Sequence, residues 1–181
     1  MMDKTMDEVK KTVSIPDDVE VTVDNNMVEV KGEKGQLSRC FPHPRITIQR
    51  KDNIIEIICR NPRKRDHAFM GTCAAHITNM ITGVKEGFEY RMKVVYSHFP
   101  IKTTVENNLF LIHNFLGERT PRRARIIEGV EVEIKGEIIL VRGVDKEKVG
   151  QTVANIERAA RVKDKDIRVF QDGVYKIAGG R

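Results

Sequence analysis

The stretch VTVDNNMVEV, residues 21–30, decides the fold, because the same pattern returns as TTVENNLFLI at residues 103–112. Each copy places β-forming residues on both sides of an acidic residue and two asparagines. Asparagine tolerates the positive φ that a tight turn needs, so this pattern predicts a β-hairpin in each copy. Two hairpins of one design indicate an internal repeat, with chance similarity of two short segments as the alternative.

Further elements follow each hairpin in the same order. Strand pairs are predicted in RITIQRKDNIIEIICR (residues 45–60) and VEVEIKGEIILVRG (residues 130–143), broken at residues 51–53 and 135–136. A helix with apolar residues at spacings of four, three and four comes next in both copies. The alignment pairs Met70, Ala74, Ile77 and Ile81 with Val149, Val153, Ile156 and Ala160, Gly71 with Gly150, and Asp66 with Asp145 near the helix starts.

The repeat predicts an α+β fold of two tandem, similar domains, each an antiparallel sheet packed against one amphipathic helix. The boundary is expected in GVKEG, residues 83–87, which divides the chain into domains 1–85 and 86–181. The following segment, FEYRMKVVYSHFPI, alternates apolar and polar residues and is predicted to open the second domain with a strand.

Composition and charge favour a polyanionic partner. The 181 residues are 40% hydrophobic and 32% charged, and 32 Lys and Arg against 26 Asp and Glu give a net charge of +6. This balance favours nucleic acid first and an anionic membrane second. No apolar run of about 18 residues and no apolar signal segment is present, so we expect a cytoplasmic protein without a membrane partner. Cys40, Cys59 and Cys73 match no metal or redox spacing and are expected to be reduced, the last two as core residues.

Nothing in the sequence predicts catalysis. The five histidines form no paired metal motif, and neither a phosphate-binding loop nor a nucleophile elbow is present. The segment GEKGQLS, residues 32–38, is interpreted as a basic loop, and Asp17 and Asp18 lie in a polar loop that suits no acid-base pair. We therefore predict a protein that is not an enzyme, with no metal, cofactor or small-molecule substrate.

The cations of the second half are the candidate binding residues. GERTPRRARI is interpreted as a loop whose arginines suit phosphate oxygens, and a second basic group begins at the end of the helix, with Arg158 and Arg161 expected one turn apart on one face. A solvated charged surface is the alternative for any one of them. The predicted RNA-binding residues are Arg119, Arg122, Arg123, Arg125, Arg158, Arg161, Lys163, Lys165, Arg168, Tyr175, Lys176 and Arg181.

The closing segment extends this basic character with glycines that suggest a flexible tail. A tyrosine beside basic residues suits the irregular surface of structured RNA better than regular duplex DNA, although Tyr175 could equally be a core residue. The run RNPRKR of the first half, with Arg60, Arg63, Lys64 and Arg65, is ranked below these groups because it could face solvent or a protein.

Long segments of the chain resemble the ribosomal protein L6 family of the large subunit, in its archaeal and eukaryotic branch. They are VEVKGEKGQLSR, FEYRMKVVYSHFPI, NLFLIHNFLGERTPRRARI and VKDKDIRVFQDGVY, and the resemblance covers nearly the whole chain. It implies duplicated α+β domains, of which mainly the second docks on large-subunit rRNA near the sarcin-ricin region and the factor-binding side. It also carries the family's RNA-facing character onto the arginines of residues 119–125 and onto Lys163, Lys165, Arg168, Tyr175 and Lys176.

The expected function is thus that of a structural constituent of the large ribosomal subunit in translation. Its partners would be large-subunit rRNA and neighbouring large-subunit ribosomal proteins, with the first domain facing proteins or partly facing RNA. The competing hypothesis is a protein-interaction adaptor, in which a sheet edge accepts a strand of a partner and the cations only keep the chain in solution.

Overall fold

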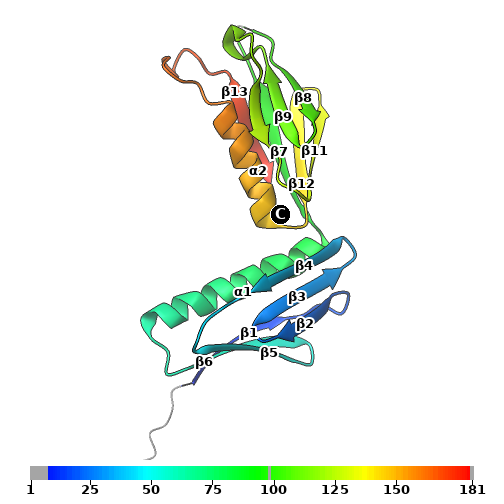
Figure 1. Cartoon of the computed structure of the whole chain (residues 1–181), viewed down its shortest axis with the longest axis vertical. Coiled ribbons are helices and arrows are strands. Elements are labelled where there is room, and N and C mark those ends of the chain that lie inside the picture. Colours follow the sequence, from blue (N-terminus) through cyan, green and yellow to red (C-terminus); the bar gives the residue numbers. More distant parts are fainter. Residues whose placement is uncertain (1–7, 98, 180–181) are drawn as a thin grey trace, which may run out of the picture. The chain divides into compact units, whose positions relative to one another are not determined.

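The chain folds into two compact units. The computed structural model describes residues 8–97 and 99–179, and its two units are Met1–Glu86 and Gly87–Arg181, which we call the N-terminal and C-terminal units. Each unit contains antiparallel strands and one long helix (Figure 1). The predicted α+β fold class, with two similar domains in tandem, is confirmed.

In the N-terminal unit, helix α1 packs against two antiparallel sheets with the strand orders β2-β3-β4 and β1-β6-β5. The sequence predicts one sheet here, whereas the strands pair in two separate groups. Residues 32–38, predicted as a loop, instead form the turn and second strand of a β3-β4 hairpin. The elements are β1 (Glu8–Ser14), β2 (Glu20–Asp24), β3 (Met27–Gly32), β4 (Gly35–Cys40), β5 (Ile46–Lys51), β6 (Ile54–Arg60) and α1 (Lys64–Lys85).

The C-terminal unit repeats this plan around helix α2, with sheets ordered β10-β9-β8 and β11-β12-β7-β13. Strand β13 has no counterpart among residues 8–86 of the N-terminal unit, and it extends the second sheet of the C-terminal unit to four strands. The elements are β7 (Phe88–Val95), β8 (Lys102–Glu106), β9 (Leu109–His113), the 3-10 turn η1 (Phe115–Gly117), β10 (Arg122–Arg125), β11 (Val130–Lys135), β12 (Ile138–Gly143), α2 (Lys146–Ala159) and β13 (Gly173–Gly179).

The two asparagine pairs form the predicted hairpin turns. Asn25 and Asn26 have φ of 44° and 64°, and Asn107 and Asn108 have φ of 44° and 61°. Two successive residues with positive φ match the right-handed twist of the flanking strands, which is why asparagine is favoured at both positions. Each turn therefore closes a two-residue hairpin, β2-β3 in one unit and β8-β9 in the other.

The second sheets of the two units share one register. The amide of Ile15 donates to the carbonyl of Asn53 at 2.8 Å, just as the amide of Val94 donates to that of Glu137 at 2.8 Å. Asn53 comes directly before β6, the strand that precedes α1, and Glu137 comes directly before β12, the strand that precedes α2. Strand β1 of the N-terminal unit therefore corresponds to β7 of the C-terminal unit.

Each unit has its own apolar core. In the C-terminal unit, Phe110 and Phe115 are fully buried beneath α2, and in the N-terminal unit Cys59 and Cys73 are buried as predicted. All three cysteines are free thiols, and burial raises the pKa of Cys73 to about 11. Within the described ranges 8–97 and 99–179, neither helix is long and apolar enough to cross a membrane.

Both helices begin at an acidic side chain near the predicted position. The carboxylate of Asp145 caps α2 by accepting the amide of Glu147 at 2.9 Å. Asp66 lies inside the first turn of α1 and accepts the amide of Arg63 at 2.8 Å. These bonds satisfy amides that a helix start leaves without partners.

Candidate nucleic-acid interface

Strand β10 carries three of the candidate arginines at the edge of its sheet. Residues 122–125 are predicted as a loop, and the structure instead pairs them with β9, Arg122 opposite Ile112 and Ala124 opposite Phe110. Because side chains alternate along a strand, Arg122 and Ala124 face the buried side, while Arg123 and Arg125 are exposed on the other. The pairing thus separates one arginine from the other two.

Arg122 is bonded inside the protein at both edges of its guanidinium. Nε and Nη2 donate to the carboxylate of Glu118 at 2.8 and 2.5 Å, and Nη1 donates to the carbonyls of Ala159 at 3.1 Å and Arg161 at 2.7 Å. The guanidinium carbon also lies 4.1 Å from the ring centre of Phe115. Arg122 thereby fastens β10 to the end of α2, and its role as an RNA ligand stays a prediction.

The positive charge of this region acts on Glu118. The hydrogen bond from Arg122 holds the pKa of the Glu118 carboxyl below its ordinary value, and the charges of Arg122 and Lys163 act in the same direction. Lys163, about 40 residues further along the chain, therefore lies near the pair that Glu118 and Arg122 form.

The end of α2 differs in detail from the prediction. The helix ends at Ala159, so Arg158 lies in its last turn and Arg161 follows the helix instead of sharing a helical face with Arg158. Along the helix towards its start, Asn155 donates its side-chain amide to the carbonyl of Arg125 at 3.0 Å. Strand β10 therefore runs beside the second half of α2.

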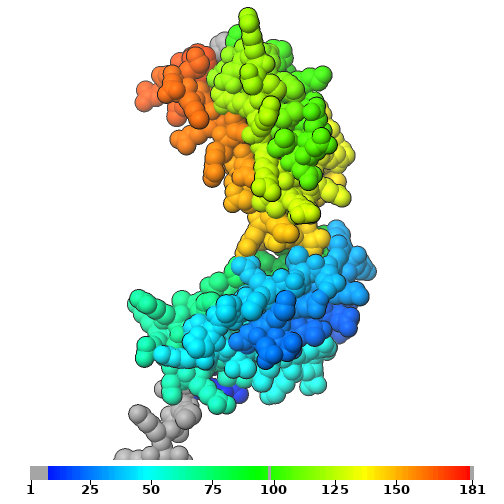
Figure 2. Space-filling view, in the orientation of Figure 1, coloured from blue at the N-terminus to red at the C-terminus, as the bar shows by residue number. Residues whose placement is uncertain are grey.

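The segment 160–172 leads from α2 to β13 and carries more of the predicted cations. Lys165 places its ammonium 4.9 Å from the ring centre of Phe170, and both Lys163 and Arg168 are exposed. At the far end of the segment, buried Asp172 accepts the amide and the hydroxyl of Ser97 at 3.0 and 2.9 Å. Figure 2 shows this orange segment and the yellow-green segment before β10 together at one end of the C-terminal unit.

Tyr175 and Lys176 lie on strand β13, although the sequence suggests that they belong to a flexible tail. Tyr175 is 47% exposed, which decides against a core position, and its hydroxyl donates to the carbonyl of Gln171 at 3.1 Å. Lys176 places its ammonium 5.4 Å from the ring centre of Tyr90. The tail is a paired strand as far as Gly179, and Arg181 lies outside the described residues.

The arginines of the other sheet are neutralised by neighbours. Glu89 accepts Arg91 Nε at 2.8 Å and Arg142 Nε at 2.6 Å, and Arg142 Nη1 is 3.1 Å from Glu133. The hydrogen bonds from Arg91 and Arg142 lower the pKa of Glu89, so these charges cancel across β7, β11 and β12. This sheet presents a balanced ionic ladder.

The cations near β10 contrast with this ladder. Within the described part of the chain, the predicted residues whose side chains have no ion-pair partner include Arg119, Arg123, Arg125, Arg158, Arg161, Lys163 and Arg168. Unpaired guanidinium groups on neighbouring segments repel one another until an anion neutralises them. The arrangement can therefore bind phosphate groups, whose oxygens match the donor fork of arginine.

Sequence reasoning missed several residues that shape this region. Glu118 precedes Arg122 by four residues, but such spacing predicts a pair only on a helix, and this segment is not helical. Ile167 and Val169 are 71% and 59% exposed beside the cations, and the alternating string DIRVF was the available signal for them. Across residues 8–97 and 99–179, no group of three His, Cys, Asp or Glu residues is placed to hold a metal ion.

Comparison with known proteins accounts for both units. The family described as ribosomal protein L6 matches residues 15–87 and, separately, residues 99–173. The chain is 53% identical over 173 residues to the large ribosomal subunit protein uL6 of Methanothrix thermoacetophila, covering 95% of this chain and 98% of that protein. It is 46% identical over 170 residues to uL6 of Methanobrevibacter smithii, covering 94% and 96% of the two chains. The chain, with one copy of the repeat in each unit, belongs to the ribosomal protein L6 family.

Proposed function

We propose that the C-terminal unit holds this chain on large-subunit rRNA, near the sarcin-ricin region and the factor-binding side of the particle. As an L6 family member, the chain is a non-enzymatic structural constituent of the large ribosomal subunit and acts in translation. The surface that meets RNA, and the place of contact, are the proposal. The N-terminal unit would face neighbouring large-subunit proteins.

The observation that carries this proposal is the unequal neutralisation of arginines within one unit. Arg91 and Arg142 have acidic partners, whereas Arg123 and Arg125 stand exposed on β10 without one in the described residues. Two exposed residues on one face of a strand are about 7 Å apart, which is close to the spacing of phosphates along an RNA strand. The face of β10 suits successive phosphates of one backbone.

The remaining candidates lie around the end of α2, to which Arg122 ties β10 through backbone carbonyls. Arg158 lies in the last turn of the helix, and Arg161 and Lys163 follow it. A folded RNA presents phosphates in an irregular arrangement, and recognition of such a surface depends on shape and charge more than on base edges. The affinity should therefore fall steeply as salt rises, because each neutralised phosphate releases counterions.

Two double variants with the same loss of charge test the proposal. In the full chain, Arg123→Ala with Arg125→Ala removes two unpaired cations, and Arg91→Ala with Arg142→Ala removes two neutralised ones. Binding to a large-subunit rRNA fragment that contains the sarcin-ricin region is measured at several salt concentrations. We expect the first double variant to bind at least about tenfold more weakly and to reduce the salt slope by about 2, one for each lost phosphate contact.

The control variant should bind like the wild type with an unchanged slope. Equal losses in both double variants would show that only net charge matters, and the β10 face would then not be the binding surface. An unchanged affinity and slope in the β10 variant would equally reject it.

A further inference from the structure

Within the part of the chain that the structure describes, no strand pairs with the outer edge of β1 in the N-terminal unit. In the sheet β1-β6-β5, strand β1 (Glu8–Ser14) pairs with β6 alone, whereas its counterpart β7 pairs with β12 on one side and β13 on the other. Edge strands that natural proteins leave open offer a row of amides and carbonyls to another chain. The comparison between the two units identifies the position where a strand is missing.

The shared register identifies which backbone groups face that position. The amide of Ile15 points to β6, where it donates to Asn53 at 2.8 Å. Since the groups of an antiparallel strand alternate in direction, those of Lys10, Thr12 and Ser14 point to the open edge. In the C-terminal unit the residue equivalent to Ser14 is Lys93, which pairs with Tyr175 of β13.

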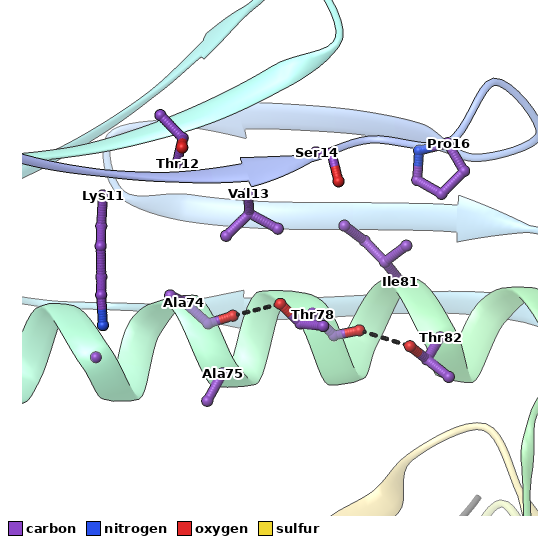
Figure 3. A pocket seen from close by; sticks show the side chains of 11 residues that line it. Lys11, Thr12, Val13, Ser14, Pro16, Ala74, Ala75, Thr78, Ile81 and Thr82 are labelled. Carbon is purple, nitrogen blue, oxygen red and sulfur yellow. Dashed lines mark hydrogen bonds between the residues drawn. The ribbon is translucent and has the colours of Figure 1, made fainter.

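A groove of about 610 Å³ lies between β1 and helix α1 at this edge. Figure 3 shows Lys11 and Val13 of β1 pointing towards the helix, and the helix residues that line the groove include small ones such as Ala74 and Ala75. The hydroxyl of Thr78 donates to the carbonyl of Ala74 at 2.9 Å, so it needs no further partner. The helix thus offers a surface of mostly small side chains, which leaves room for the side chains of an added strand.

The corresponding side of α2 is the one that meets β13. The alignment that pairs Gly71 with Gly150 also pairs Thr78 with Glu157. The carboxylate of Glu157 accepts the backbone amide of Lys176 of β13 at 3.1 Å. In the two units, equivalent helix positions therefore line the filled strand position and the open one.

We propose that this groove accepts an extended segment of another protein as a strand antiparallel to β1, in the place that β13 takes in the C-terminal unit. With the added strand beside β1, the sheet β1-β6-β5 would have four strands, and α1 would pack across one of its faces. Recognition of this kind uses backbone hydrogen bonds for affinity and alternate side chains for specificity. The inference is independent of the RNA surface proposed for the C-terminal unit.

The groove also defines the chemistry of the segment. The residue opposite Val13 meets the alanines of α1 and should be small and apolar. The residue opposite Lys11 should be acidic, because the Lys11 ammonium lies over the helix, 3.4 Å from where a Cβ would stand at Gly71. A segment with an apolar residue followed two positions later by Asp or Glu meets both conditions.

The probe is the peptide acetyl-Val-Thr-Val-Thr-Glu-Thr-amide, whose third and fifth residues would lie opposite Val13 and Lys11. It is titrated into the isotope-labelled full chain, and backbone amide shifts are followed by NMR. We expect saturable shifts centred on the amides of Thr12 and Ser14, with a Kd on the order of 1 mM. A matched peptide N-methylated at its second, fourth and sixth residues lacks the residue amides that face β1 and should cause none of these shifts.

Variants of α1 locate the binding position. Ala75→Phe fills the groove and should abolish the shifts, whereas Thr72→Phe adds the same ring at an exposed position outside the groove and should not. The unaltered spectrum of the remaining residues verifies that each variant is folded. Absence of saturable shifts with the parent peptide, or equal shifts with the N-methylated peptide, would overturn the proposal.

The assembled large subunit provides a second readout. A photoreactive benzoylphenylalanine in place of Thr72, the exposed position outside the groove, leaves the groove open and should cross-link to a protein segment with the apolar-acidic pattern, identified by mass spectrometry. Cross-links to rRNA alone, or none, would contradict a protein strand in the groove.

Discussion

Arg122 stabilises the fold through contacts within the protein, whereas Arg123 and Arg125 of the same basic cluster are exposed on the surface. Its guanidinium joins Glu118, the ring of Phe115 and the carbonyls of Ala159 and Arg161. A planar fork with fixed donors can make all of these contacts together, while a lysine ammonium acts as a single point. Arg122 therefore joins the segment just before β10 to the end of α2, which lies 37 to 39 residues further along the chain.

Replacing Arg122 with lysine should destabilise the C-terminal unit by about 1–3 kcal/mol, because carbonyls at the end of α2 lose their donor and the contact with Phe115 is lost. Urea denaturation of the full chain measures the change. Arg123→Lys, at an exposed position on the same strand, is the control and should stay within about 0.5 kcal/mol of the wild type. Equal stability of the two variants would contradict the structural role of Arg122.

The same ion pair gives this effect a pH dependence. Because Arg122 lowers the pKa of Glu118, the pair stabilises the folded state above the ordinary carboxyl value of 4.5 and loses this contribution as pH falls through the lower folded value. The stability difference between the wild type and Arg122→Lys should therefore narrow below pH 4.5.

The separate roles of Arg122 and Arg123 could not be predicted from sequence. Both are arginines in one cluster. Side chains alternate along a strand, so one of them points to the buried side of β10 and the other to the exposed side. The segment reads as a loop because Gly117 and Pro121 flank it. Its partner β9 was predicted, but the pairing between them was not.

At the scale of elements, locally determined features were the predictable ones. The asparagine turns and the two helices follow from residues within a few positions of one another, and the structure confirms them. Strands β1 and β13 were missed because each is defined by a distant partner, β6 and β7 respectively. A strand with mixed polar residues carries little local signal until its partner is known.

Helix α2 contains a glycine that packing does not require. A Cβ at Gly150 would have nothing within 4 Å, so Gly150→Ala should stabilise the unit by about 0.5–1 kcal/mol through the lower entropy of the unfolded chain and better helix propensity. Thermal or urea denaturation would detect the increase.

Gly143 is the matched position, because a Cβ there would lie 2.7 Å from Val149 Cγ2. Gly143→Ala should be destabilising by about 1–3 kcal/mol, since a packed side chain must move. Stabilisation at both glycines, or at neither, would contradict the packing described for β12 and α2.

At the scale of the whole molecule, duplication has produced two units with separate cores. The sequence predicted the duplication because a hairpin, a strand pair and a helix recur in the same order in both halves. The family model matches each unit separately, in agreement with this prediction. The sequence could not predict that the repeats differ by one strand, because β13 follows the repeated elements and resembles an ordinary basic tail.

Separate cores predict separate effects of core mutations. Ile57→Val removes a methyl group at a fully buried site of the N-terminal unit and should destabilise that unit by about 1 kcal/mol. Hydrogen exchange should accelerate for core amides of β5, β6 and α1 and stay unchanged for those of β9 and α2. Equal acceleration in both units would show that they unfold as one cooperative body.

The cation-bearing segment 160–172 is anchored at both of its ends. The carbonyl of Arg161 accepts Arg122, and the carboxylate of Asp172 accepts Ser97. A chain held at two points samples far fewer shapes than a free tail of equal length. If Lys163 and Arg168 bind rRNA, this segment would then lose little conformational entropy on binding, because it is already ordered. Electrostatic attraction between the cations and the phosphates would set the association rate.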